Sequence, residues 1–474
     1  MKTIMWFRQD LRLTDNPALI EAVKCGGIIP VYILDDYNAG PQKMGAASRL
    51  WLHHSLASLN ESLNNNLKFF KGPADEILPK LILQTNVDKI VWTRCYEPWR
   101  ITRDISLKKQ IRELGVEVKS FSGSLLWEPH QIHKSDGSHY RVFTPFYRRG
   151  CLVATPPRAP LKPPTDIKYL PQTIISKNCT LSELELLPGH KWYHSIINEW
   201  KIGEQGAREA LTEFLQNGIT SYKIGRNIPS QKSVSRLSPR LHFGELSPNQ
   251  VWYASQVLIE PGDPNLDSFL SELGWREFAH HLNFHYRTLA NENLNPKFNS
   301  FSWKMTPHRL KAWQTGMTGY PIVDAGMREL YQTGYMHNRL RMIVGSFLVK
   351  NLLQHWHHGR DWFHDCLVDA DLCVNSASWQ WIAGCGADAA PYFRIFNPIT
   401  QGEKFDADGA YTRKWVPELA ELPKKYLFCP WQAPSEILDK SGIQLGKSYP
   451  MPIVDLKTSR ELALEAFSKL PKTA

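Results

Sequence analysis

Five short apolar segments alternate with helical patterns over the first 130 residues, and this alternation constrains the fold more than any other feature. The segments are residues 3–7, 28–34, 67–70, 89–93 and 116–121. Apolar strands separated by amphipathic helices form right-handed crossovers and a parallel sheet. The sequence therefore predicts an α/β domain over residues 1–130.

Helix signals fit this Rossmann-like arrangement. Asp15-Asn16-Pro17 is a typical helix start, and leucines form an apolar stripe along residues 48–63. Parallel sheets usually bind ligands beyond the carboxyl ends of their strands. The chain has neither a Gly-x-Gly-x-x-Gly motif nor a phosphate-binding P-loop motif, so a classical dinucleotide site is not expected.

Proline density and helical periodicity divide the rest of the chain. Prolines 156, 157, 160, 163, 164, 171 and 188 fall within residues 150–200. Proline interrupts both helices and strand ladders, so we expect this proline-rich stretch to run extended over the surface, within an interdomain connector over residues 131–199. From about residue 200 the pattern is helical with Gly and Pro breaks, which predicts a larger, all-helical domain over residues 200–474.

Composition narrows the class of protein. The chain has 56 Lys and Arg against 46 Asp and Glu, a formal net charge of +10, which is compatible with a polyanionic partner but does not establish one. Its eight cysteines include no Cys-x-x-Cys pair, which favours reduced thiols in the cytoplasm and no metal site. No apolar run reaches membrane-span length, and the start lacks a signal-peptide hydrophobic region.

Residues 367–405 carry the densest set of chemically useful side chains. Asp371, Asn375 and Trp379 are four residues apart and share one face of a helix. Trp381 points elsewhere, and the Gly- and Ala-rich run after it allows close backbone approach. This pattern fits either a pocket for a flat ligand or a buried helix capped by a Gly-rich turn.

Three further segments carry candidate site residues, and the first two have two interpretations each. Five basic residues and no acidic residue lie between Lys223 and Arg240, and Ser238-Pro239 is either a phosphate-binding helix start, with Ser238 as N-cap, or a plain capped helix. Glu272, Trp275 and Arg276 share a helix face, as a buried ion pair below a core indole or as the lining of a cavity. A second helix places Asn338, Arg341, Met342 and Gly345 on one face.

The runs GADAAPYFRIFNP and QGEKFD after Trp381 resemble the flavin-binding core of the DNA photolyase/cryptochrome family. WFRQDLRLTDNPAL, SELGWREF and MHNRLRM match the same family, so the resemblance covers essentially the whole chain. It is strongest to the bacterial photolyases that act on cyclobutane pyrimidine dimers.

The resemblance implies roles for three groups of residues. The family's FAD contacts match Tyr222, Val234, Ser235, Arg236, Leu237, Ser238, Glu272, Arg341, Asp369, Asp371 and Asn375, with Val234 standing where many relatives carry Thr. Its contacts to the damaged DNA match Glu272, Trp275, Arg276, Asn338, Met342 and Trp381. Its electron-relay tryptophans match Trp303, Trp356 and Trp379.

The implied function is light-driven repair of cyclobutane pyrimidine dimers by electron transfer from photoexcited reduced FAD to a flipped-out dimer. Asn338 stands where (6-4) photolyases place a histidine, which argues against (6-4) repair. Asn375 is an amide of the kind that suits a reduced, anionic flavin. A cryptochrome-type blue-light receptor without repair activity and a basic flavin oxidoreductase are the alternatives.

The same resemblance implies a light-harvesting antenna pigment in the α/β domain. WLHHSL at 51–56 and RCYEPW at 94–99 favour 5,10-methenyltetrahydrofolate over 8-hydroxy-5-deazaflavin. A merely structural domain without pigment is the alternative. The expected partner is damaged DNA, bound independently of sequence and without a membrane, by a monomer.

Overall fold

The chain forms two compact units. The computed structural model describes residues 1–171, 178–189, 193–260, 262–390 and 392–471. Unit 1 consists of Met1–Thr220, Ser235–Arg287 and Val368–Cys373, and unit 2 consists of Ser221–Val234, Thr288–Leu367 and Val374–Ala474. The domain boundaries inferred from the sequence, at residues 130 and 200, stay a prediction.

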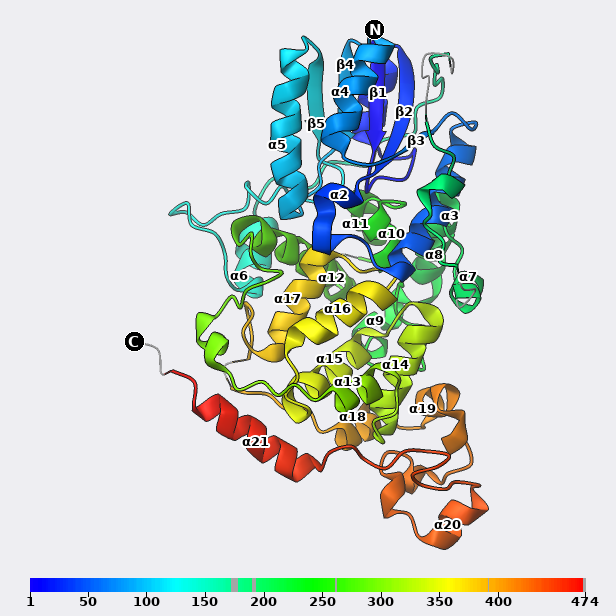
Figure 1. The fold of residues 1–474 in the computed structure, drawn as a ribbon, viewed down its shortest axis with the longest axis vertical. Coiled ribbons are helices and arrows are strands. Elements are labelled where there is room, and N and C mark those ends of the chain that lie inside the picture. The colour runs from blue at the N-terminus through cyan, green and yellow to red at the C-terminus, as the bar shows by residue number, and fades with distance from the viewer. Residues whose placement is uncertain (172–177, 190–192, 261, 391, 472–474) are drawn as a thin grey trace. The chain divides into compact units, whose positions relative to one another are not determined.

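Unit 1 contains a five-stranded sheet with the order β3-β2-β1-β4-β5 (Figure 1). The strands are β1 (Lys2–Phe7), β2 (Gly27–Leu34), β3 (Lys68–Lys71), β4 (Lys89–Thr93) and β5 (Glu117–Phe121). All neighbouring strands pair in parallel. The α/β class and the five strand positions are therefore confirmed.

Unit 1 also holds the helices α1 (Pro17–Cys25), α2 (Asp36–Ala39), α3 (Ala46–Ser62), α4 (Ala74–Thr85), α5 (Pro98–Glu113), α6 (Phe143–Pro145), α7 (His194–Glu199), α8 (Glu204–Asn217), α10 (Ser238–Phe243), α11 (Pro248–Leu258) and α12 (Pro264–His285). A π-helical turn, η2, spans Phe146–Cys151. The predicted start of α1 is confirmed, because Oδ1 of Asn16 accepts the Leu19 N–H at 3.1 Å.

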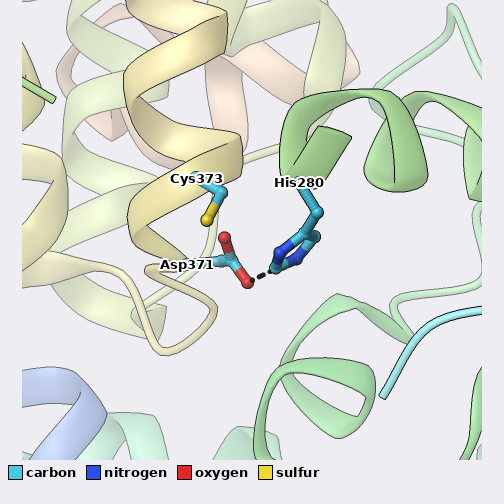
Figure 2. Close-up of side chains that lie close together, drawn as sticks. All are labelled: His280, Asp371 and Cys373. Carbon is cyan, nitrogen blue, oxygen red and sulfur yellow. Dashed lines mark ion pairs between the residues drawn. The ribbon is translucent and has the colours of Figure 1, made fainter. Parts of the chain in front are cut away.

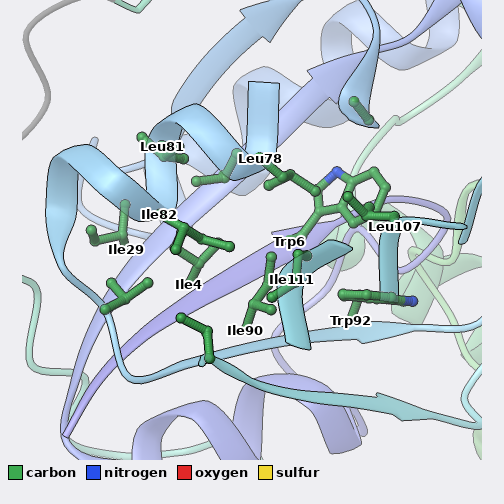
Figure 3. Close-up of a cluster of buried hydrophobic side chains, with 14 of the residues drawn as sticks. Ile4, Trp6, Ile29, Leu78, Leu81, Ile82, Ile90, Trp92, Leu107 and Ile111 are labelled. Atoms are coloured by element: carbon green, nitrogen blue, oxygen red, sulfur yellow. The ribbon is translucent and has the colours of Figure 1, made fainter. Parts of the chain in front are cut away.

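The core of the sheet lies between the strands and helices α4 and α5. Alternate residues of β1 and β4 point to one face, where Ile4, Trp6, Ile90 and Trp92 are all buried (Figure 3). The two indoles meet edge to face with ring centroids 5.5 Å apart. The helices supply a matching apolar face of Leu78, Leu81, Ile82, Leu107 and Ile111.

A buried guanidinium joins three distant segments of unit 1. Arg12 donates from Nη1 to the carbonyl oxygen of Gly244 at 2.8 Å, and from Nη2 to those of Asp15 and Gly123 at 2.9 Å each. Gly244 adopts a left-handed backbone with φ of 68°, and a Cβ at this position would lie 2.1 Å from the Gln9 carbonyl oxygen. Only glycine fits this junction.

Unit 2 is helical. Its helices are α9 (Tyr222–Gly225), α13 (Pro307–Gln314), α14 (Pro321–Thr333), α15 (Asn338–Ser346), α16 (Trp356–Cys366), α18 (Pro398–Phe405), α19 (Ala410–Trp415), α20 (Ser435–Lys440) and α21 (Leu456–Ser468). A π-helical segment, η8, spans Phe347–Asn351. Helix α17 (Leu372–Ala383) begins in unit 1 and continues in unit 2.

Single-turn 3-10 helices connect several of these elements: η1 (Gly40–Gln42), η4 (Ser182–Leu184), η6 (Ile219–Ser221), η7 (Pro296–Ser300), η9 (Pro417–Leu419), η10 (Lys424–Tyr426) and η11 (Pro430–Gln432). Among the described residues, we find no helix with the length and apolar character needed to cross a membrane.

The Ile90→Ala substitution tests the packing of the sheet core. Ile90 is fully buried, so the change should lower the free energy of unfolding by about 2–5 kcal/mol through lost burial and a residual cavity. Urea denaturation monitored by circular dichroism measures this. The control is Leu83→Ala on the exposed side of α4, which should change the value by no more than about 0.5 kcal/mol. Equal effects of the two changes would contradict the described core.

Candidate functional site

Protein side chains occupy the point at the carboxyl edge of the sheet where the strand order reverses. Arg8 follows β1 and donates from Nε to the Thr93 carbonyl at the end of β4, at 3.0 Å. It also pairs with Asp104 at 2.5 Å, and Arg103 joins Asp104 to Asp35 at 2.8 and 3.0 Å. Burial raises the pKa of Asp104, but the two arginines outweigh it and the pKa is lowered. Ligands of parallel sheets usually bind at this point, and here side chains fill it, which agrees with the absence of a dinucleotide-binding motif from the sequence.

Ser238 lies at the start of α10, but the predicted N-cap role is wrong. The N-cap is Leu237, and Ser238 is the first helical residue. Its hydroxyl instead donates to Oδ2 of Asp369 at 2.6 Å. A carboxylate is a stronger hydrogen-bond acceptor than a neutral carbonyl oxygen, so the Ser238 hydroxyl donates its hydrogen bond to Asp369. The structure thus brings together two residues of the predicted FAD set.

Arg236 precedes this helix in a left-handed conformation, with φ of 51°. Its Nη1 pairs with Oε1 of Glu199 at 2.7 Å, and its guanidinium carbon lies 4.1 Å from the Trp200 ring centroid. The side chain is therefore held from two directions. A fixed cation beside Ser235 and Ser238 has the chemistry that an anionic phosphate requires.

Asp371 is the centre of a buried cluster in unit 1. Its Oδ2 lies 3.2 Å from Nε2 of His280 on α12 and 3.6 Å from Nδ1 of His242 on α10. Figure 2 shows His280, Asp371 and Cys373 facing one another. One ligand atom from each of these three residues lies within 4.8 Å of the other two.

The charge state of this cluster depends on its surroundings. Burial raises the pKa of Asp371, but His280 and His242 outweigh it, so the pKa lies well below its ordinary value. Burial raises the pKa of the Cys373 thiol well above its ordinary value. The described groups thus place an ionised carboxylate beside two imidazoles. The expectation of no metal stays a prediction.

Helix α12 presents the predicted substrate residues in different environments. The Trp275 ring stacks on Phe143, with centroids 3.8 Å apart and planes at 11°. Arg276 donates from Nη1 to the Ser124 carbonyl oxygen at 2.7 Å. Trp275, Arg276 and Glu272 are each partly exposed, which favours a lining position over the fully buried alternative. Gly274 lets Tyr147 approach, since a Cβ there would lie 2.5 Å from its ring.

Glu277 is a structural residue of this helix that the sequence analysis missed. It is buried, and its Oε2 accepts the N–H groups of Leu126 at 3.0 Å and Trp127 at 3.2 Å. Burial raises its pKa. These partners lie about 150 positions away in sequence, so local spacing gives no signal for the contact.

In unit 2, α15 carries the predicted Asn338, Arg341 and Met342. Asn338 is exposed at the first position of the helix, and Met342 is partly exposed. Arg341 donates from Nε to the Met336 carbonyl oxygen at 2.8 Å. Arg339, which the sequence analysis did not select, lies 3.5 Å from the Met342 sulfur. Asn338 and Met342 are therefore accessible to a ligand.

Helix α17 carries three more predicted residues of unit 2, which are Asn375, Trp379 and Trp381. Asn375 is buried and donates from Nδ2 to the Arg360 carbonyl oxygen at 3.0 Å, which turns its Oδ1 away from that carbonyl. Trp381 donates from Nε1 to the Asp388 carbonyl oxygen at 3.0 Å and is partly exposed. As predicted, Trp379 and Trp381 have different surroundings.

The three predicted relay tryptophans all belong to unit 2. Trp379 lies against Gly359 of α16, where a Cβ would be 2.1 Å from its ring. Gly359 is one turn from Trp356 on the same helix face. His355 then stands between Trp356 and Trp303, with ring centroids 5.7 and 5.0 Å away. Trp379 and Trp356 are buried, whereas Trp303 is partly exposed.

The remaining members of the predicted FAD set are consistent with its chemistry. Tyr222 is buried at the start of α9, and Arg226 lies over its ring at 5.5 Å. Within unit 1, the hydroxyls of Ser235 and Ser238 and the guanidinium of Arg236 suit a phosphate; within unit 2, the buried amide of Asn375 can bond an isoalloxazine edge. The residues present therefore fit FAD.

Comparisons with known proteins bear on both parts of the chain. The sequence profile described as DNA photolyase matches residues 3–165, and that of the FAD-binding domain of DNA photolyase matches residues 269–469. The chain is 48% identical to a deoxyribodipyrimidine photo-lyase of Agrobacterium fabrum, over 99% of this chain and 98% of that protein. It is 37% identical to cryptochrome-2 of Arabidopsis thaliana, over 99% of this chain and 79% of that protein.

A solved structure is similar over nearly the whole length. The crystal structure of a bacterial class III photolyase from Agrobacterium tumefaciens matches with a TM-score of 0.94 and 47% identity, covering 98% of this chain and 97% of that one.

The Asp371→Asn substitution tests the buried cluster. Because the pKa of Asp371 is lowered by folding, its ionised form stabilises the protein above the ordinary carboxyl pKa of 3.8, and this contribution is lost as the pH falls through the lower folded value. We expect a loss of about 2 kcal/mol at pH 7 that shrinks below about pH 4. Denaturant titrations across this pH range measure it.

The matched control is Asp267→Asn on α12, whose carboxylate pairs with Arg148 at the surface. It should cost no more than about 1 kcal/mol. A deficit of Asp371→Asn that is as large at pH 3 as at pH 7 would show that its charge is not the stabilising factor.

Proposed function

Because the chain belongs to the DNA photolyase/cryptochrome family, we propose that it is a light-dependent DNA repair enzyme that splits cyclobutane pyrimidine dimers. The observation that carries this proposal is the full-length similarity, at 48% identity, to a protein named deoxyribodipyrimidine photo-lyase. The proposal also uses Asn338, which stands where (6-4) photolyases carry a histidine. A cryptochrome-type receptor is the alternative.

FAD is the cofactor of this proposal, since the chain carries the family's FAD-binding domain. Bound and photoexcited in its reduced state, it would supply the electron that opens the cyclobutane ring. Arg236, Ser235 and Ser238 would hold the phosphates, with Ser238 oriented by Asp369. Asn375 would bond the flavin ring through Oδ1, because Arg360 already engages its Nδ2.

The remaining members of the proposed FAD set are Tyr222, Val234, Leu237, Glu272, Arg341 and Asp371. Asp371 would act from the imidazole cluster that keeps its carboxylate ionised. Val234 offers no hydroxyl, so it would contribute only backbone and apolar contacts.

The dimer would leave the duplex to reach the flavin, which costs least for poorly stacked damaged bases. Trp275 and Trp381 would stack on the flipped pyrimidines, and Glu272 and Asn338 would bond their polar edges. Phe143 fixes the Trp275 ring from one side, so the indole needs little further ordering on binding. Arg276 and Met342 would complete the substrate contacts.

Trp379, Trp356 and Trp303 would form the relay that returns an oxidised flavin to its reduced state by successive electron transfers. The support is the packing of Trp379 on Gly359, the ring contacts of His355 with Trp356 and with Trp303, and the change from buried to partly exposed along the series.

The proposal also covers the antenna pigment, the DNA partner, and the location and oligomeric state of the protein. A 5,10-methenyltetrahydrofolate antenna is favoured over 8-hydroxy-5-deazaflavin. The partner is pyrimidine-dimer DNA, bound through its phosphates without sequence reading, and the protein acts as a cytoplasmic monomer. The net charge of +10 supports salt-sensitive DNA binding.

The decisive experiment compares two lesions under blue light and in the dark. We expect the purified flavoprotein to restore thymine-dimer DNA only in the light and to leave a (6-4) lesion unrepaired. Repair of neither lesion would favour the receptor alternative, and repair of the (6-4) lesion would contradict the role given to Asn338. A near-ultraviolet band beside the flavin spectrum would support the folate antenna.

Glu272→Gln tests the substrate contact within the same assay. Loss of a charged hydrogen-bond acceptor should lower dimer affinity or repair about tenfold, and the flavin spectrum measures how much FAD the variant still binds, so that activity is compared per bound flavin. Glu436→Gln, at an exposed position on α20, is the control and should repair at the unaltered rate. Full activity of Glu272→Gln would remove Glu272 from the substrate site.

A further inference from the structure

The middle tryptophan of the proposed relay has a defined hydrogen-bond partner. Trp356 is fully buried, and its indole Nε1 donates to Oδ1 of Asn293 at 2.8 Å. Asn293 lies in the segment between α12 and η7 and is only partly exposed. This contact belongs entirely to unit 2.

The amide of Asn293 is itself oriented by its neighbours. Its Nδ2 donates to Oδ1 of Asn299 at 2.8 Å, so the oxygen is the atom that faces the indole. The segment is also fixed to α17 by the buried Gln380. This side chain accepts the Leu294 N–H at 2.8 Å and donates to the Leu289 and Glu292 carbonyl oxygens at 2.7 and 2.8 Å.

Charges around Trp356 are balanced. The Arg360 guanidinium lies 5.4 Å from the indole centroid, but it pairs with Asp361 at 2.7 Å. Burial lowers the pKa of His355 and of His357 to about 4, so neither adjacent imidazole adds a positive charge at neutral pH. The Asn293 oxygen is then the polar atom placed directly on the indole N–H.

An indole that loses an electron becomes much more acidic at its N–H, so its hydrogen-bond partner decides whether the resulting radical keeps that proton. A carboxylate can take the proton. An amide oxygen accepts the hydrogen bond but is too weak a base to take the proton. Trp356 hydrogen-bonded to Asn293 would therefore remain a cation and could be re-reduced by electron transfer alone.

We propose that Asn293 is a positioning residue of the photoreduction relay that keeps Trp356 protonated, so that the positive charge moves on to Trp303. This inference rests on the proposed relay function of the three tryptophans. The photoexcited oxidised flavin is the oxidant and takes one electron through Trp379. Trp303 replaces the electron lost by Trp356 and releases its own indole proton to water, so one electron and one proton have left Trp303.

The test uses time-resolved absorption of the flavin-loaded, oxidised protein, since the protonated and deprotonated tryptophanyl radicals have different visible spectra. In a Trp303→Phe background the positive charge must stop at Trp356. We expect the protonated cation radical with Asn293 present, and the deprotonated neutral radical with Asn293→Asp. Asn293→Leu, which removes the acceptor, should lower the yield of long-lived radical about tenfold.

Asn291→Asp is the matched control, because it adds the same charge two residues away at an exposed position. It should leave the protonated cation radical unchanged, and thermal melts of all variants check that each is folded. A protonated cation radical in Asn293→Asp as well would overturn the proposal for Asn293.

Trp356→Phe separates this proposal from the relay itself. Loss of the long-lived tryptophanyl radical in this variant, together with unaltered radicals in both Asn293 variants, would refute the role of Asn293 and leave the relay standing. Undiminished radical formation in Trp356→Phe would refute the relay, and the inference about Asn293 with it.

Discussion

Unit 1 depends on one buried cation. The Arg12 guanidinium bonds carbonyl oxygens from the segment after β1, the segment after β5 and the turn that ends α10. Removing a guanidinium from water is costly unless its donors find acceptors, so these three carbonyls must stay where they are. The sheet edge that carries the Arg8 network and the helix that carries Ser238 are thereby fixed to the same side chain.

In unit 2, close packing and side-chain amides hold segments that are distant in the sequence to one another. Gly359 allows Trp379 to lie directly on α16. Gln380, the next residue along α17, holds the segment that carries Asn293. Adjacent positions of α17 therefore pack on the helix that carries Trp356 and hold the segment that accepts its hydrogen bond.

The sheet could be predicted from the sequence because its signals are local. The strands β1, β2 and β4 are runs of mostly apolar residues, and Asn16-Pro17 carries the start of α1 within three positions. The shared helix face of Glu272, Trp275 and Arg276 could be predicted for the same reason, because residues three and four positions apart lie together on a helix. Periodicity alone does not decide whether these residues belong to the core or line a pocket. Only the resemblance to a family indicates roles for them.

The missed residues act over long sequence distances. Nothing near Ser238 indicates that its hydroxyl bonds Asp369, which lies 131 positions away, in preference to capping its own helix. The partners of Glu277 lie about 150 positions away, and those of Asn293 and Gln380 come from different elements. Such contacts arise from the folded arrangement of the segments, which hydrophobic periodicity does not encode.

The make-up of unit 1 also bears on the order in which the chain can fold during synthesis. Its carboxylates Asp369 and Asp371 come from Val368–Cys373, a short piece that follows two of the three segments of unit 2 in the chain. Ribosomal synthesis delivers the N-terminal segments first. His242 and His280 must therefore wait for Asp371 until more than three-quarters of the 474 residues have been made. A nascent chain can form the parallel sheet early, but it can complete the histidine–aspartate cluster only late.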